Sequence, residues 1–212
     1  MGKAGRKLLE GTKATRERRR IKAQRSATDA AADELRLALA KFLAESSDVL
    51  FAAAEAVAGS LRAGGKILVF GNGGSAAEAQ HFAAELVNGL RRRGGRPLPA
   101  VALTTDTSCL TAVGNDRSFS EVFSRQVEAL GRPGDIALAL TTSGSSMNVL
   151  KGLQTARTKG LVTVALTGEG GGRVAGLADH LLEAPSRSTP RIQEAHLFIL
   201  HLLAEKMEET AS

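Results

Sequence analysis

Apolar residues in the first third of the chain recur at helical spacing. From Asp29 to about Arg62 they form two successive patterns, separated by a polar stretch near residue 46. The apolar positions are Leu35, Leu37, Leu39, Phe42 and Leu43, followed by Val49, Leu50, Phe51, Ala54 and Val57. Such spacings place apolar residues on one side of a helix. The sequence AGG at 63–65 ends the second pattern, so the chain is expected to begin its fold with a pair of helices.

Beyond residue 65 the pattern changes to short apolar runs, each followed by a helical stretch. The runs are KILVF (66–70), LPAVAL (98–103), DIALALTTS (135–143), LVTVALTG (161–168) and DHLLEA (179–184). A last helix is expected from about Thr189 to Glu208. Nearly continuous apolar strands that alternate with helices are typical of a parallel sheet covered on both faces. The predicted fold is therefore α/β, a single doubly wound domain with a five-stranded parallel sheet flanked by helices.

The basic charge of the chain is concentrated at its N-terminus. The net charge is +6, but residues 1–26 carry ten Lys and Arg against two Glu, and the remainder has a net charge of −2. A dense run of like charge with few core-forming residues favours a disordered tail over 1–28, ahead of a domain over 29–212. A weak arm for nucleic acid or another anionic partner is the alternative. The nearly neutral domain gives no reason to expect nucleic acid beyond weak attraction by the tail.

The amino-acid composition limits the cellular compartments and the classes of partner that are expected. Cys109 is the single cysteine, so no internal disulfide can form and a reducing compartment is expected. The chain contains no run of eighteen apolar residues, so no membrane span or membrane partner is expected. Trp and Tyr are absent, which argues against a base-stacking surface for single-stranded nucleic acid. Together these features favour a cytoplasmic location.

Three predicted strands end in loops that suit an anion. FGNGGS follows the first strand, TTSGSS (141–146) the third, and LTGEGGG (166–172) the fourth. Ligands of such sheets bind beyond the carboxyl ends of the strands. GNGGS matches neither a dinucleotide fingerprint nor a phosphate loop with Lys-Ser/Thr, so a tight turn would explain it equally well. TTSGSS places five hydroxyls where a helix begins, more than capping requires, and favours phosphate binding.

A histidine and a glutamate follow the first glycine loop on one predicted helix. His81 and Glu85 are four residues apart, so both side chains can reach one point. Alone, they are more typical of an exposed helical pair. Gln193 and His201 lie on a similar face of the last helix, which favours a shared site. Their separation of eight residues spans about 12 Å along the axis, a long distance for two ligands of one ion. His196 points elsewhere and is interpreted as an ordinary packed or surface histidine.

Several blocks in this order resemble the phosphoheptose isomerases, a family with a sugar-isomerase (SIS) domain. The blocks are GNGGSAAEAQHFAAEL, ALTTDTSCLTAVGND, VFSRQVEALGRPGD, TTSGSSMNVLKG and RIQEAHLFILHLL. The resemblance covers about residues 29–212. It implies interconversion of sedoheptulose 7-phosphate and D-glycero-D-manno-heptose 7-phosphate through an enediol, in the route to activated heptose. It also implies a homotetramer with sites at subunit interfaces and one Zn²⁺ per subunit.

The resemblance also implies roles for individual residues. Glu85 is expected as the base and His201 as the general acid/base. The implied zinc ligands are His81, Glu85, Gln193 and His201. The implied substrate contacts are Asn72, Gly73, Gly74, Ser75, Glu85, Asn115, Asp116, Thr141, Thr142, Ser143, Ser146 and Gln193. The sequence departs from the family at Gly89, where relatives have arginine; Arg91–Arg93 lie close by.

Two other classes share parts of this pattern. A replication-initiator-associating protein has the same fold without catalysis, but that branch lacks the glutamate and the last histidine and carries arginine in its hydroxyl loop. This chain has Glu85, His201 and Ser143 at those places, which favours the isomerase. A sugar-phosphate-sensing transcription regulator would need a DNA-binding domain ahead of the sheet, and residues 1–28 are too short for one.

Overall fold

The computed structural model describes residues 3–89 and 97–210 and contains the predicted sheet. Its strands are β1 (Ile67–Gly71), β2 (Ala100–Ala102), β3 (Ile136–Leu140), β4 (Val162–Thr167) and β5 (His180–Glu183). They pair in the order β2-β1-β3-β4-β5, and every pair is parallel. Val69 on β1 lies between Ala102 and Leu138, and Leu138 lies opposite Val164. Because the strand order reverses between β1 and β3, the switch point at which such sheets bind ligands lies between these strands.

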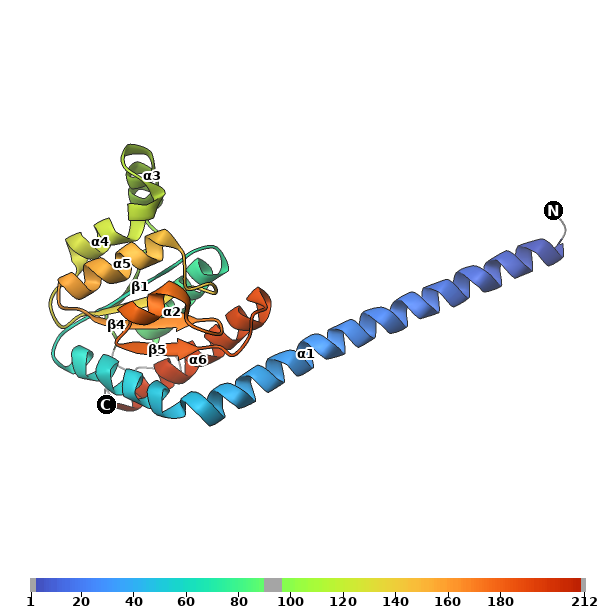
Figure 1. Cartoon of the computed structure of the whole chain (residues 1–212), viewed down its shortest axis with the longest axis horizontal. Coiled ribbons are helices and arrows are strands. Elements are labelled where there is room, and N and C mark those ends of the chain that lie inside the picture. Colours follow the sequence, from blue (N-terminus) through green and yellow to red (C-terminus); the bar gives the residue numbers. More distant parts are fainter. Residues whose placement is uncertain (1–2, 90–96, 211–212) are drawn as a thin grey trace. The chain divides into compact units, whose positions relative to one another are not determined.

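Helices cover both faces of the sheet. They are α2 (Gly74–Asn88), α3 (Thr107–Asp116), α4 (Val122–Leu130), α5 (Met147–Thr158) and α6 (Thr189–Thr210), with short 3₁₀ helices at Phe119–Glu121 and Gly172–Leu177. Along β1, Ile67 and Val69 join a core formed with α1, α2 and α6, whereas Leu68 and Phe70 join a second core with α4 and α5. Figure 1 shows α4 and α5 on one side of the sheet and α6 on the other. The alternation follows from the two-residue period of a strand.

The N-terminal helix α1 spans Lys3–Arg62 and differs from the predicted disordered tail. The stretch contains no proline and is rich in Ala, Lys, Arg, Leu and Glu, all strong helix formers, which accounts for helix where charge alone suggested disorder. The chain divides into two compact units, residues 1–37 and 38–212. In the first unit, the described side chains at 24–30 are all exposed.

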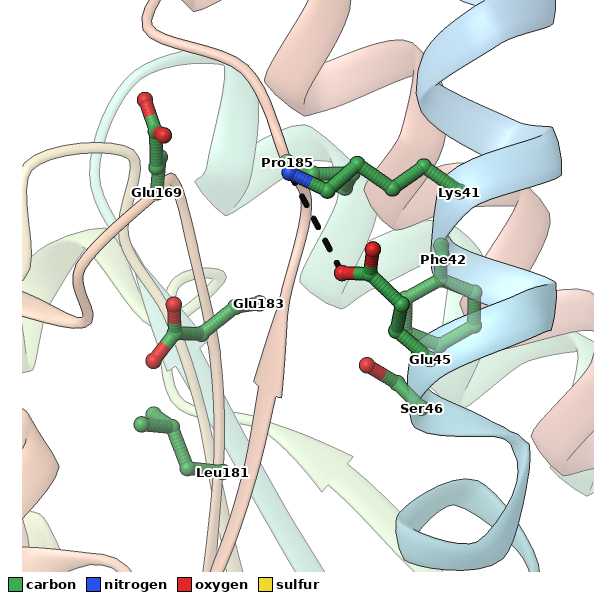
Figure 2. A pocket seen from close by; sticks show the side chains of 8 residues that line it. All are labelled: Lys41, Phe42, Glu45, Ser46, Glu169, Leu181, Glu183 and Pro185. Atoms are coloured by element: carbon green, nitrogen blue, oxygen red, sulfur yellow. Dashed lines mark ion pairs between the residues drawn. The ribbon is translucent and has the colours of Figure 1, made fainter.

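The two helical patterns predicted before residue 62 are segments of this one helix. Phe42 of the first segment is buried, as are Leu50 and Val57 of the second. Between them the hydroxyl of Ser47 donates to the carbonyl of Leu43, and such back-bonding often bends a helix. The α1 ribbon changes direction just beyond Ser46 (Figure 2). The predicted pair thus corresponds to a bend within one helix.

A buried carboxylate fixes the amino edge of the two central strands. Asp135, which is 3% exposed and precedes β3, accepts hydrogen bonds from Lys66 N at 2.9 Å, Lys66 Nζ at 2.5 Å and Arg132 N at 2.8 Å. Burial alone would raise the pKa of Asp135, but the bonds from Lys66 and Arg132 outweigh it and lower the pKa.

Within the described chain, no helix is both long and apolar enough to cross a membrane.

Candidate active site

The loop after β1 leads directly into α2, and α6 packs tightly against it. A Cβ added at Gly74 would overlap the amide group of Gln193 on α6, so a side chain at this position would displace that amide. Ser75, in the first turn of α2, is buried. No side chain caps the N-terminus of α2 in the described structure. Backbone N–H groups at such a terminus favour an anionic ligand, in keeping with the predicted substrate loop.

The hydroxyl loop after β3 is a tight turn that packs on the loop after β4. The hydroxyl of the buried Thr141 accepts from Gly144 N at 3.2 Å, and that of Ser143 accepts from Ser145 N at 3.2 Å. Gly144 has φ +61°, and a Cβ there would overlap the carbonyl oxygen of Gly171. Ser146 precedes α5 without forming a side-chain cap. The predicted hydroxyls therefore gather at the carboxyl edge of the sheet.

Asn72 and Asn148 tie these two loops together. The Nδ2 of Asn72 donates to the Oδ1 of Asn148 at 2.9 Å, and the Nδ2 of Asn148 donates to the Oδ1 of Asn72 at 2.8 Å. Asn148 is 4% exposed and lies in the first turn of α5. Sequence reasoning predicted Asn72 and missed Asn148, which stands in the quoted block TTSGSSMNVLKG without a loop or a charge to mark it.

The structure brings three of the four predicted metal ligands together where α2 and α6 meet. The Nε2 atoms of His81 and His201 are 2.9 Å apart, and their rings meet edge to face with centroids 5.2 Å apart. The Oε1 of Glu85 lies 3.9 Å from the Nε2 of His81. Two imidazoles in contact, with a carboxylate near one of them, can exchange protons with a ligand and supply nitrogen and oxygen donors.

Gln193 does not join this cluster within the chain. Its amide lies beside Gly74, seven residues before His81, which is about 10 Å along the axis of α2. Among the described residues, no group of three or more His, Cys, Asp or Glu side chains is placed to hold a metal ion. The donors that do converge match zinc in type, since zinc takes histidine nitrogen and carboxylate oxygen, but the complete set of four is not assembled in one chain.

Two other predicted positions lie apart from the cluster. Asn115 and Asp116 end α3, where the Nδ2 of Asn115 donates to the Oδ1 of Asp116 at 2.8 Å and both residues are exposed. Figure 1 shows α3 projecting away from the sheet beyond α4 and α5. Gly89 ends α2 with φ +86°, where any side chain would be strained, so the family's arginine does not fit this backbone. Arg91–Arg93 lie outside the described residues.

A largely buried pair of polar side chains, Glu78 and His196, lies between Gln193 and the histidine cluster, and the sequence did not predict this pairing. The Nε2 of His196, which is fully buried, lies 3.0 Å from the carbonyl oxygen of Thr167, and its Nδ1 is 3.9 Å from the Oε2 of Glu78. Burial raises the pKa of Glu78 to about 7 and lowers the pKa of His196 to about 4. Of the two interpretations of His196, a packed or a surface histidine, the structure has the packed one. Its apposition to Glu78 depends on how α2 and α6 pack, which the sequence does not display.

Two cavities of the described chain lie elsewhere. One of about 270 Å³ lies between α1 and the loops around β5. Figure 2 shows the side chains that line it: Lys41, Phe42, Glu45, Ser46, Glu169, Leu181, Glu183 and Pro185. The other, of about 500 Å³, is lined mostly by residues of α4 and α5, with Arg117, Glu121 and Lys159 beside them. Neither of these two cavities includes a predicted site residue.

Comparison with known proteins agrees with this arrangement. The SIS domain family matches residues 32–168. The phosphoheptose isomerase of Paramagnetospirillum magneticum is 59% identical over 159 residues, covering 74% of this chain and 82% of that protein. The phosphoheptose isomerase of Aquifex aeolicus is 55% identical over 153 residues, covering 72% and 80%. The solved structure of phosphoheptose isomerase from Neisseria gonorrhoeae has a TM-score of 0.82 at 42% identity, covering 87% of this chain and 98% of that one. The chain therefore belongs to the SIS domain family and, within it, to the phosphoheptose isomerases.

Proposed function

We propose that this protein is an aldose–ketose isomerase that interconverts sedoheptulose 7-phosphate and D-glycero-D-manno-heptose 7-phosphate and so feeds the synthesis of activated heptose. The observation that carries the proposal is the His81–Glu85–His201 cluster, present in a chain 59% identical to a phosphoheptose isomerase. The initiator-binding alternative lacks support, because the relatives are isomerases and this chain has the acid–base residues. We place the activity in the cytoplasm, where the free thiol of Cys109 stays reduced.

The cluster has the groups that this isomerisation needs. Moving a proton between carbon 1 and carbon 2 requires a base near the carbon-bound hydrogen and a proton donor at the oxygens. Glu85 serves as the base. His201 exchanges protons with the substrate oxygens. The loops at Asn72–Ser75 and Thr141–Ser146 hold the phosphate end, so that binding energy from a part of the substrate that does not react orients the part that does.

A zinc ion is part of the proposal. His81, Glu85 and His201 would contribute ligands to it without forming a complete site in one chain, and bound zinc would polarise the substrate carbonyl as a Lewis acid. Support comes from the donor types and from the 2.9 Å approach of the two Nε2 atoms. Because Gln193 of the same chain lies about 10 Å away along α2, we propose that assembly of several copies, a homotetramer with sites at its interfaces, completes the ligand set. Exposed Val49 and Phe51 on α1 offer apolar surface for such contacts.

The test is incubation of the purified protein with sedoheptulose 7-phosphate, with and without added zinc, followed by detection of the aldoheptose 7-phosphate. The variant Glu85→Gln should fold normally and lose turnover by about 100-fold, the usual cost of removing an acid–base group. Glu55→Gln, at an exposed glutamate of α1, is the matched control and should keep wild-type turnover. Absence of turnover under both conditions would remove the proposed function, whereas near wild-type turnover by Glu85→Gln would show that another group is the base.

A further inference from the structure

The Asn72–Asn148 pair has a feature that a simple tie between loops does not need. Each amide both donates to and accepts from the other, over 2.8 and 2.9 Å, so the two groups meet edge to edge. The Oδ1 of Asn148 also accepts from Val149 N at 2.9 Å. Because a backbone N–H can only donate, this bond fixes which end of the Asn148 amide is oxygen. The orientation of the Asn72 amide is thereby fixed as well.

A fixed Asn72 amide keeps part of its hydrogen-bonding capacity. The amide nitrogen has two hydrogens and the oxygen two lone pairs, and Asn148 uses one of each. One donor and one acceptor remain, on opposite flanks of the amide, on a residue that is partly exposed at the carboxyl edge of β1. A sugar hydroxyl both donates and accepts, so a hydroxyl of a polyol can bind at either flank. If the Asn72 amide could flip, its remaining donor and acceptor would exchange places.

We infer that Asn148 is a positioning residue of the isomerase site, which orients Asn72 toward the hydroxyl groups of the sugar phosphate. The inference rests on the proposed function. Asn148 itself is 4% exposed and sits behind Asn72, so it acts through Asn72 and not by touching the substrate. The same pair also keeps the β1 loop beside the first turn of α5, where the hydroxyl loop ends.

The test combines single and double variants. Asn148→Asp keeps the acceptor for Val149 N but replaces the amide donor with an oxygen that faces the Oδ1 of Asn72. It should raise KM for sedoheptulose 7-phosphate about 10-fold, the effect of one lost hydrogen bond, with a smaller change in kcat. Asn72→Ala should raise KM similarly. The KM of the double variant should be no higher than that of the single variant with the higher KM, because both changes remove the same contact. Gln154→Glu, at an exposed amide on the same helix, is the matched control.

A second measurement detects orientation without turnover. In ¹⁵N-labelled protein the side-chain NH₂ signals of Asn72, identified by their loss in Asn72→Ala, should shift and broaden in Asn148→Asp and stay unchanged in Gln154→Glu. Additive effects on KM, or unchanged Asn72 signals, would overturn the inference while leaving the proposed function intact. An unmeasurable turnover by the wild-type protein would instead overturn the proposed function, and the role of Asn148 in isomerisation with it.

Discussion

Replacing Glu78 or His196 should change how stability depends on pH, in opposite directions. The Oε2 of Glu78 and the Nδ1 of His196 face each other at 3.9 Å, and neither atom has a hydrogen-bond partner in the described structure. The Thr167 carbonyl can only accept, so the Nε2 of His196 carries the hydrogen and Nδ1 is unprotonated in the neutral ring. Burial keeps both side chains neutral by raising the pKa of Glu78 to about 7 and lowering that of His196 to about 4.

The two shifts have opposite consequences for stability. For Glu78 the folded pKa lies above the unfolded value of 4.5, so its stabilisation is complete below about pH 4.5 and is lost as the pH rises through about 7. For His196 the folded pKa lies below the unfolded value of 6.5, so its stabilisation is present above about pH 6.5 and is lost as the pH falls through about 4. Each gap corresponds to about 3 kcal/mol. Between about pH 4.5 and 6.5 the two slopes nearly cancel in the wild-type protein.

The assay is urea unfolding of each variant and the wild type from about pH 4 to about pH 8. Glu78→Gln should match the wild type at the acid end and exceed its stability by up to about 3 kcal/mol at the alkaline end, because glutamine cannot ionise. His196→Gln, whose amide can still donate to Thr167, should gain relative to the wild type as the pH falls below about 6.5. Glu128→Gln, at an exposed glutamate, controls for loss of a surface charge. A stability difference between Glu78→Gln and wild type that does not change with pH would refute the reasoning.

Three further outcomes are expected. His201→Ala should abolish turnover and lower the zinc that copurifies, measured by mass spectrometry; unchanged zinc would take His201 out of the ligand set. Asp135→Ala should cost about 3 kcal/mol in urea unfolding, since it leaves a partly buried Lys66 ammonium unpaired, and an unchanged midpoint would contradict the role of this carboxylate. Deletion of residues 1–25 should leave turnover and Tm unchanged and remove any DNA retention at low salt, whereas loss of activity would make these residues part of the assembly.

The sheet was predictable because its strands bury both faces. IALAL of β3 has no polar residue and all five side chains are buried, so a parallel strand is the simple explanation of the run. The length of β2 was less predictable: LPAVAL gave a strand of three residues, in which Val101 is exposed at the edge of the sheet. The dense positive charge of the N-terminus favoured a disordered tail, because repulsion among lysines and arginines was given more weight than their helix propensity. The structure has a helix from Lys3.

The candidate site was only partly predictable, because several of its contacts depend on packing. The i, i+4 spacing of His81 and Glu85 places both on one helical face without knowledge of the fold. By contrast, the approach of His201 to His81 requires α6 to lie along α2 in one particular register. Asn148 and Glu78 look like ordinary polar residues of amphipathic helices until the neighbouring element is known. Family resemblance supplied His201 but not these two.

That register has a simple physical origin. Gly74 meets Gln193, Glu78 meets His196, and His81 meets His201, so α2 and α6 run parallel, with both N-termini at the carboxyl edge of the sheet. Parallel helices place their positive dipole ends on the same side, where the substrate phosphate is expected to bind. In each pair the residue of α6 follows the residue of α2 by about 119 positions. A shift of α6 by one residue relative to α2 would therefore separate all three pairs. The Gln193 amide occupies the space that a Cβ at Gly74 would take, so a residue without a side chain leaves this contact between the two helices undisturbed.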